Sequence, residues 1–290
     1  MVSSDARLLR FALPAACGLR MQPSADGYLV PTGVSVVANV TSMHAGGEIL
    51  RKSYSPVSLP DAEQHLDLLV KAYPPRPGGG LGSRLCGMEP GESITMEIKP
   101  PRLIHGSPVV AGRWGRLGLV GGGTGIAPMV QIVRFLLAAP ADTTEIWLLS
   151  INRHEGDILM REELERLEQS HPSRLHLAFS LTRPPIGWQG AVGRGDVAMA
   201  ASSLPAPRPS AKQGAATGDN EEWGAGASAA PDAPSDTMVM VCGTDGFVET
   251  WAGHIERHKD TETGKSVKRQ GPLKGILSAA GFREYQVYKF

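Results

Sequence analysis

Short apolar and alternating runs fill the first third of the chain and predict strands. They are Leu8–Leu13, Gly33–Val40, Leu66–Ala72 and Ser93–Ile98, and Gly, Pro and Asp residues separate them. Apolar residues at every second position are typical of a strand with one buried face, and clustered turn residues mark its ends. Several short strands at this spacing predict a β-barrel or a sandwich.

After residue 115 the pattern changes, and strand-like segments alternate with helix-like ones. Compact apolar runs predict strands at Leu117–Val120, Glu145–Ser150, Arg174–Ser180 and Thr237–Cys242. Apolar residues at helical spacing predict helices at Pro128–Ala138 and Met160–Gln169. Strands that alternate with helices in this way predict a doubly wound parallel sheet.

Two segments of different composition interrupt this alternation. Residues 205–236 are rich in Ala, Pro, Gly and Ser. Such a segment buries too little apolar surface to offset the entropy lost on ordering, so we expect a disordered insertion there. The polar segment Lys259–Gln270 predicts a second, smaller insertion on the surface.

Length and composition set the broad class of the protein. With 290 residues the chain exceeds the usual size of one compact core, which predicts two domains. The formal net charge of +0 gives no reason to expect a nucleic acid or an anionic membrane as partner. The three cysteines, Cys17, Cys86 and Cys242, suggest neither a disulfide framework nor a metal site. No stretch approaches the roughly 20 apolar residues of a membrane span. We therefore expect no anchor in this chain, and a place in the cytoplasm or on the cytosolic face of a membrane.

The clearest candidate for chemistry is the glycine-rich segment LVGGGTGIAPM at Leu119–Met129. Glycine permits close approach of a ligand to the backbone, and the helix that follows offers N–H groups and a positive dipole end to a pyrophosphate. The spacing differs from GxGxxG, and a tight turn without a ligand is the alternative. The residues that this turn would bring to a dinucleotide are Gly122, Gly123, Thr124, Gly125, Ala127 and Pro128.

A second candidate stands at the end of the predicted strand Thr237–Cys242. Open α/β sheets bind ligands at the carboxyl ends of their strands, and the sequence VMVCGTDGF places Cys242 and Gly243 there. A lone buried cysteine is usually a small apolar residue, so a packing role is the alternative.

Two further segments combine aromatic, cationic and small residues. In RKSYSPVS a tyrosine stands beside hydroxyls and cations, which suits stacking on a flavin and binding of its phosphates, although a plain strand end is equally compatible. In VKAYPPRPGGGLGS another Lys and Tyr precede a glycine run that resembles a phosphate cradle of backbone amides. The candidate residues are Arg51, Lys52, Ser53, Tyr54, Ser55, Val70, Lys71, Tyr73, Gly78, Gly79, Gly80, Leu81, Gly82 and Ser83.

Taken together, these blocks resemble the NADH–cytochrome b5 reductase branch of the ferredoxin–NADP reductase superfamily. KSYSPVS is similar to the RxY[ST]PVS flavin motif, GGGTGIAPM to AGGTGITPM, and VCGTDGF to CGPPxM. DILMREELERL resembles the helix after the second strand of the nucleotide domain. The resemblance runs from about Arg7 to Phe290, nearly the whole chain.

The resemblance implies an N-terminal antiparallel FAD-binding β-barrel at residues 1–112, with its first strand missing from this chain. It also implies an NAD(P)-binding domain with a doubly wound parallel sheet at residues 113–290. Hydride would pass from NADH to flavin N5, and electrons would then leave singly to cytochrome b5 or a similar haem acceptor. Tyr54 would lie against the flavin ring, Thr124 and Gly125 would face the cofactors, and Cys242 would orient the nicotinamide. Phe290 is included among the cofactor-binding residues.

The sequence departs from the family pattern at several positions. Lys52 stands where the flavin motif has arginine, and Arg51 would reach the phosphates only through a strand bulge. Gly82 occupies the place of a serine, with Ser83 following, and Ala127 replaces a threonine. Thr182, beside Arg183, replaces an acid that disfavours the 2′-phosphate of NADPH. We therefore expect use of NADH with tolerance for NADPH.

The nature of the acceptor leaves alternatives open. A basic patch for an acidic acceptor would consist of Arg76, Arg84, Arg113, Arg116 and Lys274, although for each of them individually solvated surface charge is the more common explanation. One alternative function is the reductase of another electron-transfer system in the same superfamily. The other is a catalytically impaired, flavin-free scaffold.

Overall fold

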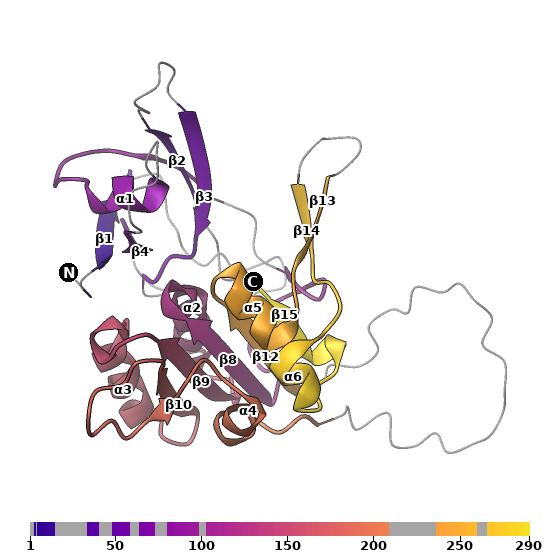
Figure 1. The fold of residues 1–290 in the computed structure, drawn as a ribbon. Coiled ribbons are helices and arrows are strands. Elements are labelled where there is room, and N and C mark those ends of the chain that lie inside the picture. Colours follow the sequence, from indigo (N-terminus) through magenta and orange to yellow (C-terminus); the bar gives the residue numbers. More distant parts are fainter. Residues whose placement is uncertain are drawn as a thin grey trace, which may run out of the picture.

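The computed structural model describes residues 3, 5–14, 34–40, 48–58, 64–72, 80–98, 103–208, 236–259 and 266–290. Tyr73, Gly78, Gly79, Arg76 and Cys17 lie outside these ranges, as does nearly all of the expected insertion at residues 205–236. Figure 1 shows a large sheet flanked by helices in the C-terminal half, with the N-terminal strands above it.

A six-stranded parallel sheet forms the C-terminal half and confirms the doubly wound prediction. Its strand order is β11-β10-β9-β8-β12-β15, and every neighbouring pair is parallel. The continuous apolar runs become strands because both faces of a parallel sheet are buried. The strands are β8 (Arg116–Gly122), β9 (Glu145–Asn152), β10 (Leu175–Leu181), β11 (Ala191–Val192), β12 (Thr237–Cys242) and β15 (Val287–Lys289).

Helices cover both faces of this sheet. Helices α2 (Ile126–Ala138) and α3 (Arg161–Ser170) pack into one apolar core with β8 and β9, and both were predicted from helical spacing. Helices α4 (Val197–Ser203), α5 (Asp245–Ala252) and α6 (Gly275–Ala279) pack into a second core on the opposite face, around the fully buried Trp251. Where the structure describes this half, it also has short 3₁₀ turns at Gly123–Gly125, Glu155–Asp157 and Glu284–Gln286.

The N-terminal half consists of antiparallel strands, as their alternating patterns predict. Strand β1 (Ala6–Ala12) pairs with β4 (His65–Lys71), and β2 (Val34–Val40) lies between β3 (Glu48–Tyr54) and β5 (Thr95–Ile98). A bridge between Pro56 and Leu68 links the end of β3 to β4. The closure of these strands into a barrel remains a prediction.

A short helix and a small hairpin complete the described part of the N-terminal half. Helix α1 (Leu81–Cys86) packs with β4 in an apolar cluster that includes Leu66, Leu68 and Leu85. Strands β6 (Leu103–Ile104) and β7 (Ser107–Pro108) form a hairpin just before β8.

One apolar cluster runs across the junction of the two halves. Ala6, Val57, Leu69 and Ile104 from the N-terminal part are buried in the same cluster as Ile126 of α2. His105, in the turn between β6 and β7, adds a hydrogen-bond contact of 3.0 Å between its Nε2 and the carbonyl oxygen of Val287. The two halves therefore share a packed interface, and that interface fixes how the N-terminal strands face the glycine turn.

The segment expected as a small surface insertion is an antiparallel hairpin where the structure describes it. Strand β13 (Glu256–Lys259) pairs with β14 (Ser266–Arg269), and residues 260–265 between them lie outside the described ranges. In Figure 1 this hairpin projects away from the large sheet, next to α5.

Candidate functional site

The glycine turn and the Cys242–Gly243 strand end meet, as the sequence led us to expect. Gly121 of β8 lies opposite Cys242 of β12 in the parallel register. A Cβ added to Gly125 would lie 2.2 Å from the carbonyl oxygen of Cys242 and 2.8 Å from the amide nitrogen of Gly243. Only glycine fits at such a distance. The two segments therefore pack backbone against backbone at the carboxyl edge of the sheet.

Phe247 closes the same junction from the side of α5. A Cβ on Gly122 would lie 2.9 Å from the Phe247 ring, and one on Gly243 would lie 2.5 Å from it. Thr244 caps α5 by accepting a hydrogen bond from the Phe247 amide at 3.4 Å, which holds this ring in place. Gly122 and Gly243 thus flank the Phe247 ring at distances that no larger residue permits.

On the open side of the turn, the backbone is ready to receive an anion. Gly123 has φ +54°, and a Cβ there would meet nothing within 4 Å. Helix α2 begins at Ile126 without a side-chain cap. Pro128, its third residue, has no N–H and suits the first turn, where an N–H would find no acceptor within the helix. The N-terminus of a 13-residue helix offers N–H groups and a positive dipole end, the arrangement that binds phosphates.

Phe290 lies beside the end of β12. Its amide donates to the carbonyl oxygen of Val241 at 3.0 Å, and its ring meets Tyr288 edge-on, with centroids 5.3 Å apart. Cys242 is half-buried and contacts the apolar cluster beneath the turn. Cys242, Gly243 and Phe290 are therefore brought together with the glycine turn.

On the flavin side, β3 separates its two cations onto opposite faces. Lys52 and Tyr54 share one face, with the Lys52 Nζ 5.6 Å from the ring centroid, a cation–π contact. Arg51 points the other way and pairs with Glu97 at 2.9 Å. The β2–β3 register runs without interruption from Val34↔Tyr54 to Val40↔Glu48. The bulge through which Arg51 would reach this face is therefore absent from β3, and Lys52 is the cation beside Tyr54.

The last part of the expected glycine cradle is the start of helix α1. A Cβ on Gly82 would lie 2.6 Å from the carbonyl oxygen of Lys71 and 3.9 Å from the Tyr54 hydroxyl. A serine cannot stand at position 82 without moving β4, which explains why the hydroxyl follows at Ser83. Val70 and Leu81 are buried in the apolar cluster of β4 and α1, so their side chains are part of the core of this half.

The remaining predicted residues of this region have contacts of their own. The Lys71 Nζ lies 2.8 Å from Asp5, and Ser53 and Ser55 stand on either side of Tyr54 at the end of β3. Gly80 precedes α1, and a Cβ there would meet nothing within 4 Å. This side therefore offers a lysine, a tyrosine ring and closely approached backbone, a set that fits an aromatic ring system carrying phosphates.

Thr182 and Arg183 follow β10 at the same edge of the sheet. Their amides donate to the carbonyl oxygens of Asn152 and Arg153, at 3.0 and 2.9 Å. The Gly193 amide donates to Leu181 at 3.0 Å, which brings the next residue, Arg194, alongside the strand end.

Sequence reasoning missed Arg194. Trp251 Nε1 donates to the Arg194 carbonyl at 3.0 Å, so the backbone is fixed while the side chain is exposed. A Cβ on Gly195 (φ +114°) would lie 2.2 Å from Trp251. The signal in the sequence is the pair of glycines around Arg194, a pattern that marks a constrained turn.

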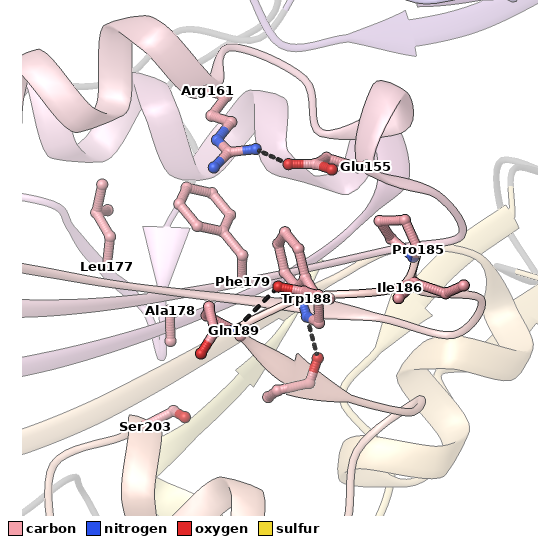
Figure 2. A pocket seen from close by; sticks show the side chains of 13 residues that line it. Glu155, Arg161, Leu177, Ala178, Phe179, Pro185, Ile186, Trp188, Gln189 and Ser203 are labelled. Atoms are coloured by element: carbon pink, nitrogen blue, oxygen red, sulfur yellow. Dashed lines mark hydrogen bonds and ion pairs between the residues drawn. The ribbon is translucent and has the colours of Figure 1, made fainter.

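A cavity of about 600 Å³ lies beside β10, under the loop at residues 185–190. Figure 2 shows the Arg161 guanidinium above the rings of Phe179 and Trp188, at 5.7 and 5.9 Å from their centroids. Arg161 donates hydrogen bonds to the carboxylates of Glu165 and Glu155, at 2.8 and 2.7 Å, and these bonds hold its pKa above the usual value. The stack of Arg161 on Phe179 and Trp188 holds the loop after β10, which begins with Thr182 and Arg183, against the sheet.

The expected basic patch is wrong for Arg113. This half-buried side chain donates to the carbonyl oxygens of Ile104, Ser107 and Pro108 at 2.7 to 2.8 Å, and it lies over the ring of Trp114. Arg116 lies 3.4 Å from Asp236. Arg113 therefore holds the β6–β7 hairpin in place and does not face a partner.

The described residues contain neither a cluster of metal ligands nor a membrane-spanning helix. Within these ranges, no group of three or more His, Cys, Asp or Glu residues is arranged to hold a metal ion. None of the helices in the described part of the chain combines the length and apolar character that crossing a bilayer requires.

Comparison with known proteins matches both halves of the chain. Residues 1–102 match the family model for the oxidoreductase FAD-binding domain, and residues 119–252 match the model for the oxidoreductase NAD-binding domain. NADH-cytochrome b5 reductase 2 of Chaetomium globosum is 30% identical over 290 residues, which cover 100% of this chain and 69% of that protein. The human protein of the same name is 30% identical over 275 residues, covering 87% of this chain and 84% of the relative.

The solved structures include a similar domain. The cytochrome b5 reductase domain of Ulva prolifera nitrate reductase superposes with a TM-score of 0.69 at 25% identity. The match covers 100% of this chain and 93% of that domain.

Proposed function

The chain belongs to the NADH–cytochrome b5 reductase family, and from this membership we propose that it oxidises NADH through bound FAD and reduces cytochrome b5. The observation that carries the proposal is the contact of the glycine turn with Cys242–Gly243. The turn also contacts β4, next to the Lys52–Tyr54 face. Residues suited to a flavin and residues suited to a nicotinamide dinucleotide therefore line neighbouring parts of one edge.

On the flavin side, the residues bind and orient. When bound, FAD supplies a ring that accepts hydride and releases electrons one at a time. Lys52 would neutralise the pyrophosphate as a point charge, and Tyr54 would support the ring by stacking. Ser53, Ser55 and the backbone of residues 80–83 would complete the phosphate contacts, with Arg51 at the outer rim.

On the nicotinamide side, the residues hold the dinucleotide at a fixed angle to the flavin. Gly122, Gly123, Thr124 and Gly125 would accept the pyrophosphate at the α2 N-terminus, flanked by Ala127 and Pro128. Cys242, Gly243 and Phe290 would orient the nicotinamide and exclude water from it. Hydride transfer requires no side chain as acid or base, so positioning is the contribution of the protein.

Selectivity between NADH and NADPH is set by the end of β10 in this proposal. Thr182 offers no carboxylate to repel a 2′-phosphate, and the exposed Arg183 and Arg194 offer two cations to bind it. We therefore propose that the enzyme prefers NADH and tolerates NADPH.

The organisation of the chain follows from the same proposal. Residues 1–112 would form the FAD-binding barrel and residues 113–290 the nicotinamide domain. The enzyme would act in the cytoplasm or on the cytosolic face of a membrane, where NADH and cytochrome b5 meet.

The test is reconstitution of the purified protein with FAD, followed by steady-state reduction of cytochrome b5. We expect a yellow protein that reduces cytochrome b5 with NADH. Protein that binds FAD but reduces only other haem or iron–sulfur acceptors would support a different reductase of the same superfamily. Protein that stays colourless with excess FAD would support a flavin-free scaffold and contradict the proposal.

A further inference from the structure

Three aromatic side chains form a row that crosses the junction of the two halves. The imidazole of His105 meets the ring of Tyr288 edge-on, with centroids 5.9 Å apart and an interplanar angle of 87°. The Tyr288 ring meets Phe290 in the same way, at 5.3 Å and 87°. Tyr288 and Phe290 share a face because side chains two residues apart along an extended strand point the same way. The row therefore leads from the β6–β7 turn to Phe290 at the candidate site.

A hydrogen bond also ties the start of this row to the backbone of β15. The His105 Nε2 lies 3.0 Å from the carbonyl oxygen of Val287. Because a carbonyl oxygen only accepts, Nε2 carries the proton of the imidazole. Burial keeps the pKa of His105 below its ordinary value, so the ring is neutral near pH 7. One side chain of the N-terminal half thus contacts both the backbone and an aromatic ring of the last strand.

The turn that carries His105 has a backbone conformation that favours other residues. Ile104 pairs with Ser107, so His105 and Gly106 form a two-residue hairpin turn, with φ +47° and +77°. Turns with positive φ at both central positions prefer Asn-Gly or Gly-Gly. A side chain that is unfavourable in its own turn is expected where the contacts of that side chain are needed. The contacts of His105 are those with Val287 and Tyr288.

The hairpin itself is held in place, so the position of His105 is fixed. The Arg113 guanidinium donates to three carbonyl oxygens of the hairpin at 2.7 to 2.8 Å, those of Ile104, Ser107 and Pro108. The Ile104 side chain is fully buried in the apolar cluster that joins the two halves. An imidazole held in this way limits the rotation of the ring that it contacts.

We propose that His105 is a positioning residue for hydride transfer, which sets the orientation of the Phe290 ring through Tyr288. This inference rests on the proposed function, in which Phe290 orients the nicotinamide. The Phe290 amide fixes the backbone beside Cys242 through its hydrogen bond to Val241 at 3.0 Å, and the aromatic row restrains the ring. Small displacements of reacting groups slow a reaction strongly. A residue of the flavin-binding half thereby helps to align the dinucleotide.

The experiment uses three variants of the full chain loaded with FAD. His105→Asn removes the first ring of the row, while asparagine suits the turn, so the hairpin should fold at least as well. His105→Phe keeps a ring beside Tyr288 and loses the hydrogen bond to Val287. The matched control is Ile104→Val, which removes a buried methyl group from the neighbouring residue and leaves all three rings in place.

The first measurement is single-turnover reduction of the flavin over a range of NADH concentrations. We expect His105→Asn to slow the rate at saturating NADH about tenfold, because the nicotinamide is less well aligned. The apparent Kd for NADH should change by less than about twofold, because the glycine turn still holds the pyrophosphate. His105→Phe should lose less of the rate than His105→Asn, and Ile104→Val should match the unaltered protein.

The second measurement needs no NADH and follows hydrogen exchange of the Phe290 amide by NMR. This amide is protected by its hydrogen bond to Val241. We expect exchange to be about tenfold faster in His105→Asn, because the last residue of the chain loses a restraint. The Leu164 amide, which donates to Met160 at the start of α3, is the internal reference and should exchange at an unchanged rate.

The possible outcomes separate this inference from the function beneath it. Normal flavin reduction in His105→Asn, or equal slowing in Ile104→Val, would overturn the positioning role and leave the proposed function intact. Unchanged exchange of the Phe290 amide would overturn it too, as would equal losses in His105→Asn and His105→Phe, because Tyr288 would then transmit nothing. If the unaltered protein fails to reduce its flavin with NADH, the proposed function falls, and the role of His105 in hydride transfer falls with it.

Discussion

Single glycines decide how closely the two cofactor-binding segments approach. At Gly125, the hypothetical Cβ would lie 2.2 Å from Cys242, and at Gly82 it would lie 2.6 Å from Lys71. The sequence predicted a glycine turn from its composition, but it showed no difference between Gly125 and its neighbours. The backbone that Gly125 meets comes from a distant strand, so only the fold reveals why glycine is required there.

Replacing Gly125 by alanine should disturb this junction. Forcing a methyl group into a packed contact destabilises a protein by about 1–3 kcal/mol. A displacement of the turn by about 1 Å should slow hydride transfer about 100-fold. Gly246→Ala is the matched control, because a Cβ there meets nothing within 4 Å. Thermal unfolding and single-turnover flavin reduction measure the two effects, and equal behaviour of both variants would contradict the assigned role.

The residues that follow β10 are proposed to set the selectivity between NADH and NADPH. Thr182→Asp restores a carboxylate beside the proposed 2′ position, and Arg194→Ala removes a cation from it. We expect each change to raise the KM for NADPH about tenfold and to leave the KM for NADH nearly unchanged. Steady-state kinetics with both cofactors provide the check. A very large preference of the unaltered enzyme for NADH would refute the proposed tolerance for NADPH. Equal changes in the KM for NADH and for NADPH would refute the position proposed for the 2′-phosphate.

At the scale of elements, periodic segments were predictable and short glycine-rich or polar ones were not. The strands β8, β9, β10 and β12 and the helices α2 and α3 follow directly from apolar spacing. Helix α1 was missed because its six residues follow three glycines, which are typical of a loop. The register of β2 and β3 was also beyond sequence reasoning, because a bulge leaves no fixed signature in composition.

Lys52, beside Tyr54, should contribute strongly to the binding of FAD, while Arg51, which is paired with Glu97, should contribute little. Lys52→Ala removes the cation beside Tyr54, and we expect the Kd for FAD to rise about tenfold. Arg51→Ala removes an exposed residue paired with Glu97 and should change the Kd by less than about twofold. Titration of the apoprotein with FAD measures the Kd of both variants. A larger rise in Kd from Arg51→Ala than from Lys52→Ala would place the phosphates on the face of Arg51.

The β6–β7 hairpin and β15 are joined by a contact that depends on pH. Burial is the main cause that lowers the pKa of His105, the Val287 carbonyl opposes it, and Arg113 adds to it. As pH falls below the ordinary histidine pKa of about 6.5, the unfolded chain therefore binds the proton first. The stability that His105 contributes is present above that pH and declines below it, down to the folded pKa.

The variant His105→Gln should weaken this dependence. Glutamine retains a polar side chain but does not titrate. The melting temperature of the variant should therefore fall less than that of the unaltered protein between pH 7 and about pH 5. Parallel melting curves across that range provide the measurement. Identical curves would show that His105 stays equally protonated in the folded and unfolded states.

At the scale of the whole molecule, the sequence correctly predicted which segments belong together but not how they touch. The rule that open sheets bind ligands at their carboxyl edge predicted that Gly121–Met129 and Cys242 share one edge. The packing of Ala6, Val57, Leu69 and Ile104 against α2 was not visible from spacing, because it joins residues of two separate patterns. This interface makes the two proposed cofactor sites parts of one unit.

The most direct test of the account is anaerobic mixing of the FAD-loaded protein with NADH in a stopped-flow instrument. We expect the flavin band to bleach in a single turnover, and oxidised cytochrome b5 added afterwards to restore the band while becoming reduced. A flavin band that persists in the presence of excess NADH would contradict the central claim that these two sites form one hydride-transfer junction.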